Sequence, residues 1–75
     1  MSSKFDRFME RGYTDIRHEE DRHTVNGLFR LWSAYTIAGM RMFTCTYRDN
    51  EGVKRTPFFA SPAPALDIAR DRARD

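Results

Sequence analysis

Two histidines and a run of carboxylates are the residues that come closest to a known catalytic pattern. Glu19 follows His18, and His23 comes five residues after His18. A zinc-protease box is H-E-x-x-H, which places both histidines on one helical face. Here Arg22 occupies the second histidine position, and on a helix His18 and His23 would lie about 140° apart. On a strand they would face opposite sides. The spacing favours solvated polar residues over a metal site.

The remaining reactive side chains offer no catalytic pattern. Cys45 stands among threonines, and a nucleophilic thiol needs a nearby base and partial exposure. The four glycines are isolated, whereas a phosphate-binding loop needs several together. We therefore expect a protein that is not an enzyme, with no catalytic, cofactor-binding or metal-binding residue and no cofactor.

Charge is distributed unevenly, although the net charge is only +2. One acidic cluster precedes residue 24, and we predict that it binds a partner through charge complementarity. It consists of Asp15, Glu19, Glu20 and Asp21. Residues 24–60 carry five basic and two acidic side chains. Four of those basic residues are the alternative, nucleic-acid-binding candidates: Arg41, Arg48, Lys54 and Arg55.

Length and composition indicate a single domain over residues 1–75. The hydrophobic content of 40% is a globular value. One cysteine allows no intrachain disulfide framework, which suits a reducing cytoplasm. Charged side chains interrupt the first eleven residues, unlike a signal peptide. We expect a cytoplasmic protein without membrane contact, as a monomer or a homodimer; an exposed Met42–Phe58 patch would be compatible with the homodimer.

A β-hairpin is predicted from Met40–Arg48 and Val53–Ala60, joined by Asp49–Gly52. Asp at the first turn position and Gly at the fourth fit a type I turn closed by a left-handed residue. This turn pairs Tyr47 with Arg55, Cys45 with Pro57, and Phe43 with Phe59. The Phe43–Phe59 face is the expected core. Because Pro57 lacks an N–H, the second strand should be an edge strand or bulged there.

The two segments before this hairpin are harder to assign. Residues 28–37 could form a helix ending at Gly39, but their aromatic and β-branched content favours a strand. Residues 14–25 could be an edge strand, because Asn26-Gly27 is a two-residue hairpin signal. They could equally be a polar loop.

Helices are predicted at both ends of the chain. Ser3 can cap a short helix with an apolar stripe of Phe5, Phe8 and Met9 that ends at Gly12. Ser61 is the expected N-cap of a C-terminal helix with prolines in its first turn. The buried stripe of that helix is Ala65, Leu66, Ile68, Ala69 and Ala73. The predicted fold is α+β: a three- to four-stranded antiparallel meander, a short N-terminal helix, and a C-terminal helix packed on one face.

Residues 30–73 resemble an AP2-like or integrase arm-type DNA-binding module. The likeness rests on the Y-R-D-x-x-G run at Tyr47–Gly52, the following Phe58-Phe59 pair and the Ala-rich helix. In that family the open face of a three-stranded sheet enters the major groove. The resemblance implies that Arg41, Arg48, Lys54 and Arg55 contact DNA.

The chain as a whole is similar in profile to phage-encoded anti-CRISPR proteins, which are very short, single-domain and without a shared motif. That resemblance implies an inhibitor in the host cytoplasm. Its partner would be a host nucleoprotein complex, a CRISPR effector, whose nucleic-acid binding it blocks. The acidic cluster would engage the basic channel of the effector. Exposed aromatics are alternative anchors: Tyr13, Trp32, Tyr35 and Phe58, although core packing is favoured for Trp32.

Overall fold

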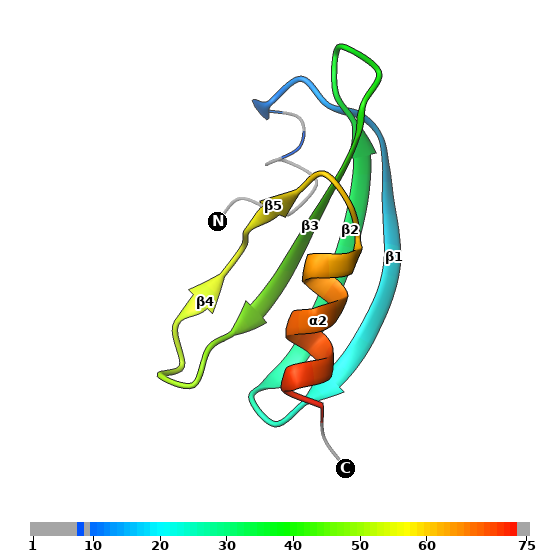
Figure 1. The fold of residues 1–75 in the computed structure, drawn as a ribbon. Helices are drawn as coiled ribbons and strands as arrows, with labels where there is room; N and C mark the ends of the chain where they lie inside the picture. The colour runs from blue at the N-terminus through cyan, green and yellow to red at the C-terminus, as the bar shows by residue number, and fades with distance from the viewer. Residues whose placement is uncertain (1–7, 9, 74–75) are drawn as a thin grey trace.

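The structure, a computed structural model, describes residue 8 and residues 10–73. These residues contain five strands and the helix α2 (Figure 1). They are β1 (Thr14–Thr24), β2 (Gly27–Tyr35), β3 (Arg41–Arg48), β4 (Lys54–Arg55), β5 (Phe58–Phe59) and α2 (Ala63–Asp71). All pairings are antiparallel, in the order β1-β2-β3-β4, and β5 also pairs with β3. This confirms the small antiparallel sheet with a C-terminal helix. The N-terminal helix predicted from Ser3 falls largely outside the described residues.

The two segments before the hairpin, whose secondary structure the sequence left open, are both strands. β2 confirms the strand prediction for residues 28–35, whereas Thr36 and Ile37 belong to the β2–β3 turn. β1 is the edge strand that competed with a polar loop. Thr24 pairs with Gly27, so the two loop residues are Val25 and Asn26, one position earlier than predicted. The Thr24 hydroxyl explains this shift, because it donates to the Gly27 carbonyl at 2.7 Å and accepts from the Asn26 N–H at 3.2 Å.

The core lies between the sheet and α2. Alternate residues of β2 and β3 point toward the helix, because successive side chains of a strand face opposite sides. Small residues on α2 let the helix approach the sheet closely. The buried cluster comprises Phe29, Leu31, Phe43, Cys45, Ala65 and Ala69, with Tyr47, Phe59, Leu66 and Ile68 packed against it. The predicted Phe43–Phe59 face and the predicted helix stripe up to Ala69 are therefore confirmed.

Two details of α2 differ from the prediction. Pro62, not Ser61, occupies the N-cap, and its carbonyl accepts from the Leu66 N–H at 3.0 Å. Among the described residues no side chain caps the helix, because Ser61 lies one residue too early. Ala73 is exposed rather than buried, since the helix has ended before it and its backbone forms an isolated bridge with Thr24.

Proline divides the last strand as expected. Tyr47 pairs with Arg55 and Phe43 with Phe59, which confirms the predicted register. Between these two pairs Pro57 offers no N–H to β3, so the strand is interrupted and appears as β4 and β5. The Thr44 hydroxyl donates to the Pro57 carbonyl at 2.8 Å and holds the interruption against the sheet.

The predicted turn between β3 and β4 is also present. Gly52 adopts φ +82°, the left-handed conformation that glycine takes without steric cost. One oxygen of Asp49 accepts from the N–H groups of Glu51 and Val53, both at 2.9 Å. The hydrogen bond from Val53 is the largest cause that lowers the pKa of Asp49 below its usual value, and Arg55 adds to it. The carboxylate thus stabilises the turn while it is ionised.

Candidate functional site

All four carboxylates of the predicted acidic cluster lie on β1, and each contacts a basic side chain of the same chain. The pairs are Asp15–Arg17 at 3.2 Å, Glu19–Arg41 at 2.7 Å, Glu20–Arg22 at 2.6 Å and Asp21–Arg30 at 3.5 Å. His18 also contacts Asp21 at 2.6 Å. The cluster is therefore a row of alternating charges along an exposed edge strand, with little net negative potential.

The acidic residues do not share one face of the sheet. Residues directly opposite in an antiparallel pair project to the same side. Glu20 lies opposite the core residue Leu31, on the side of α2, whereas Asp21 lies opposite Arg30, on the other side. Asp21 therefore cannot contact the same flat partner surface as the acidic residues on the α2 side.

A β-bulge changes the predicted positions of the histidines. The register shifts between His18 and Glu20, so that His18 lies opposite Trp32 and His23 opposite Leu28. The two histidines therefore face the same side, and the prediction of opposite sides is wrong because one extra residue resets the alternation. The described residues contain no group of three His, Cys, Asp or Glu side chains that could hold a metal ion. Cys45 is fully buried in the core.

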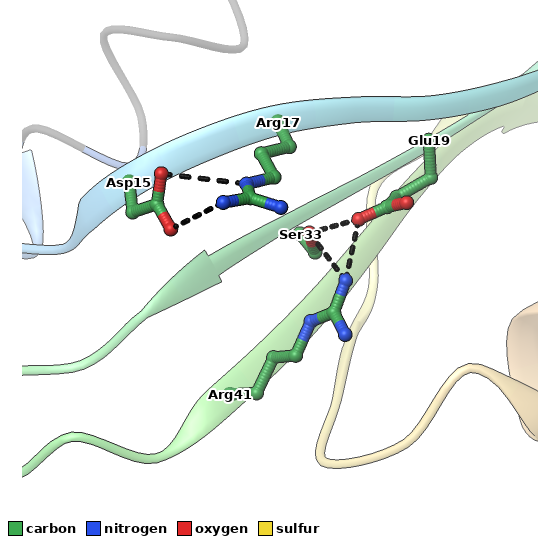
Figure 2. Close-up of polar contacts among 5 residues, drawn as sticks. All are labelled: Asp15, Arg17, Glu19, Ser33 and Arg41. Carbon is green, nitrogen blue, oxygen red and sulfur yellow. Dashed lines mark hydrogen bonds and ion pairs between the residues drawn. The ribbon is translucent and has the colours of Figure 1, made fainter.

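A polar network joins three strands on the α2 side of the sheet (Figure 2). The buried Ser33 hydroxyl donates to the Glu19 carboxylate, and the Arg41 guanidinium donates to the same oxygen at 2.7 Å. The Asp15–Arg17 pair lies next to it along β1. The Ser33 hydrogen bond is the largest cause that lowers the pKa of Glu19 below its usual value of 4.5, with Arg41 contributing further.

Replacing Ser33 with alanine tests this network. We expect the pKa of Glu19 to rise toward 4.5, because the largest cause of its lowering is removed. A carboxylate with a lowered folded-state pKa contributes stability above its unfolded-state pKa and loses it as the pH falls through the folded-state value. The variant should thus be about 1 kcal/mol less stable at pH 7 and closer to the parent at pH 2. Urea unfolding and an NMR titration of the Glu19 carboxyl carbon measure both effects. A parent-like Glu19 pKa in the variant would contradict the assignment.

An exposed apolar group lies at the β2–β3 turn, beside this network. Ile37 is 86% exposed, and Tyr35 and Met40 are exposed as well. The turn is tightly held, since Thr36 N–H donates to the Met40 carbonyl at 2.8 Å. We call Tyr35, Ile37 and Met40 the apolar hairpin end. Of these three residues, only Tyr35 was predicted as an anchor. The signal for Ile37 and Met40 is their position on either side of the Ala38-Gly39 turn.

The other predicted aromatic anchors are engaged within the chain. Phe8 is buried against Phe58, with ring centroids 5.8 Å apart, and against Tyr13 at 5.9 Å. The Arg11 guanidinium lies 4.0 Å above the Phe58 ring, so the proposed Met42–Phe58 patch is covered at Phe58. Trp32 packs against the His18 ring. Of the four named aromatics, Tyr35 is exposed, whereas Tyr13, Trp32 and Phe58 are half-buried.

The four predicted nucleic-acid-binding residues separate into two pairs. Arg41 and Arg55 form ion pairs, with Glu19 at 2.7 Å and Asp49 at 3.0 Å. Both project to the α2 side, since Arg41 lies opposite Tyr35 and Arg55 opposite Tyr47. Arg48 and Lys54 lie opposite each other and project to the other side. The structure therefore does not bring the four cations together.

No helix within the described residues is long and apolar enough to cross a membrane. Comparisons of the chain with protein-family models, with curated proteins and with solved structures find no match.

Proposed function

We propose that this chain is a non-catalytic binding protein that docks on a partner protein through the apolar hairpin end. The observation that carries the proposal is the exposure of Ile37, 86%, on a turn fixed by backbone hydrogen bonds. Tyr35 and Met40 extend the apolar surface, and the Glu19–Arg41 pair provides a charged rim. Protein interfaces combine an apolar centre with such a polar rim.

The partner we propose is a host nucleoprotein complex of the CRISPR-effector type, bound in the host cytoplasm so that its nucleic-acid binding is blocked. The support is charge placement: Asp15, Glu19 and Glu20 line one side of β1 and would meet the basic channel of such an effector. Each of these carboxylates is already paired within the chain, so together they orient the partner at close range and add little affinity. The apolar residues supply the affinity.

Replacing Ile37 with aspartate tests the docking surface. An anchor at the centre of an interface is worth 2 kcal/mol or more, so we expect binding to a purified, guide-loaded effector to weaken about 30-fold. Val25→Asp is the matched control, because Val25 is 65% exposed at the opposite end of β2. Biolayer interferometry measures both dissociation constants. Equal weakening in the two variants would refute the assignment of the surface, and absence of any complex with the parent would refute the partner.

The contribution of the acidic residues is tested separately. Glu19→Lys combined with Glu20→Lys should slow association with the effector and abolish co-purification, because two attractive charges become repulsive. Unchanged association in this double variant would exclude β1 from the interface.

A second candidate function, a small DNA-binding module, is favoured by one observation. Arg48 and Lys54 lie opposite each other on the face of the sheet that α2 leaves open. If duplex DNA is shifted at near-physiological salt, and Arg48→Ala with Lys54→Ala abolishes the shift, this function replaces the inhibitor.

A further inference from the structure

A pocket of about 230 Å³ opens at the end of the sheet remote from the apolar hairpin end. It lies between the β1–β2 and β3–β4 turns, which are both at the bottom of Figure 1. Its lining consists of Asn26, Gly27, Leu28, Thr46, Tyr47, Arg48 and Lys54. Drug-sized ligands occupy pockets of roughly 300–1,000 Å³, so this one fits a smaller group.

Divergence of two strands creates the pocket. The β2–β3 ladder ends at the pair Arg30–Thr46, although β2 begins at Gly27 and β3 continues to Arg48. Beyond that pair the two hairpins are joined by side chains, since the Asn26 side-chain Nδ2 donates to the side-chain Oδ1 of Asn50 at 2.9 Å. This bond links the two turns beside the pocket.

The two cations of the pocket differ from most others in the described chain. Six arginines there each pair with a carboxylate: Arg17, Arg22, Arg30, Arg41, Arg55 and Arg70. Arg11 and Arg72 lie over aromatic rings. Lys54 has no carboxylate partner within the described residues, and Arg48 donates only to the Gly52 carbonyl, at 2.9 Å. None of the described residues that line the pocket is acidic, and the nearby Asp49 is held by its own turn.

Placing Arg48 and Lys54 directly opposite each other is unfavourable in itself. Opposed residues have Cβ atoms about 5 Å apart, and like charges at that distance destabilise a sheet. A bound anion would offset the repulsion. The bond to Gly52 fixes the Arg48 side chain while leaving other guanidinium N–H groups for a ligand. The Thr46 hydroxyl adds a polar group that is buried and makes no hydrogen bond within the described residues.

We propose that this pocket binds a phosphate group, carried by a nucleotide or by a nucleic-acid strand. Arg48 and Lys54 hold the phosphate oxygens, as arginine and lysine do in other phosphate sites. Leu28, exposed in the wall, offers an apolar surface to the adjoining sugar or base. The site goes beyond the protein-binding function proposed above, because it shares no residue with the apolar hairpin end. For a nucleic-acid ligand it deepens the second candidate function, which uses the same Arg48 and Lys54.

The test is an NMR titration of the whole ¹⁵N-labelled chain with four separate probes: inorganic phosphate, AMP, a short single-stranded oligonucleotide and a short DNA duplex. We expect the amide signals of Gly27, Thr46, Arg48 and Lys54 to shift with a phosphate-bearing probe. Lys54→Gln should raise the dissociation constant at least ten-fold. Arg55→Gln is the matched control, adjacent in sequence but paired with Asp49 on the other face, and should change it less than two-fold.

The probes separate the two sources of phosphate. Shifts with AMP as strong as those with the oligonucleotide assign the site to a free nucleotide, whereas shifts with an oligonucleotide or duplex alone assign it to a nucleic-acid strand. Equal loss in Lys54→Gln and Arg55→Gln, or shifts spread over all basic residues, would overturn the proposal. Ile37→Asp should retain the phosphate response, so failure of the protein-binding proposal remains distinguishable.

Discussion

Replacing Phe29 with alanine is expected to remove most of the stability of this protein. Phe29 is fully buried at the centre of the core cluster. Truncating a buried phenylalanine costs about 3–5 kcal/mol, because apolar contacts are lost and a cavity remains. The total free energy of unfolding of a 75-residue domain is about 4–11 kcal/mol. Urea unfolding, followed by the fluorescence of the single tryptophan, should show a midpoint near zero denaturant or an unfolded chain.

The control for this variant is Val25→Ala, which also shortens an apolar side chain. Val25 is exposed in the β1–β2 turn, and surface substitutions usually change stability by less than about 0.5 kcal/mol. If Phe29→Ala unfolds at the same urea concentration as Val25→Ala, the core is not the one described.

Enlarging Ala65 to leucine is expected to be the next most harmful change. Ala65 is fully buried where α2 meets the sheet, so three additional carbons have no space. Overpacking of this kind costs about 1–3 kcal/mol, since the helix must move away from β3. Thermal unfolding measures the loss. Ala63→Leu is the control, because Ala63 is exposed on the same helix and should stay within about 0.5 kcal/mol of the parent. A variant at Ala65 as stable as this control would show a loosely packed interface.

Local signals were sufficient for the second half of the fold. Asp49 and Gly52 determine the turn, and the turn alone determines that Tyr47 meets Arg55 and Phe43 meets Phe59. The missing N–H of Pro57 predicts the interruption between β4 and β5. Each of these inferences depends on residues within about seventeen positions of one another.

The first half of the sheet was harder because its signals are not local. β1 has few apolar residues, and its strand conformation depends on pairing with β2. The bulge beside Glu19 has no residue type that announces it, so the shared face of His18 and His23 could not be inferred.

The candidate sites also depend on contacts between residues that are distant in the sequence. The acidic run on β1 was evident in the sequence, but two of its cationic partners, Arg30 and Arg41, come from other strands. Their pairing converts an expected negative patch into alternating charge. Arg48 and Lys54 could be placed opposite each other from the hairpin register. The pocket beside them could not be predicted, because it arises where β2 and β3 diverge.

Because Cys45 is buried, its thiol is a natural probe for transient opening of the fold. The thiol lies at the centre of β3 with no exposed surface, beneath α2. A thiol reagent such as Ellman's can reach it only when the helix leaves the sheet or the whole domain unfolds, so the labelling rate follows the population of open molecules. With one cysteine in the sequence, that rate reports a single process without any engineered label. Comparing it with the urea-derived stability would separate detachment of α2 from global unfolding.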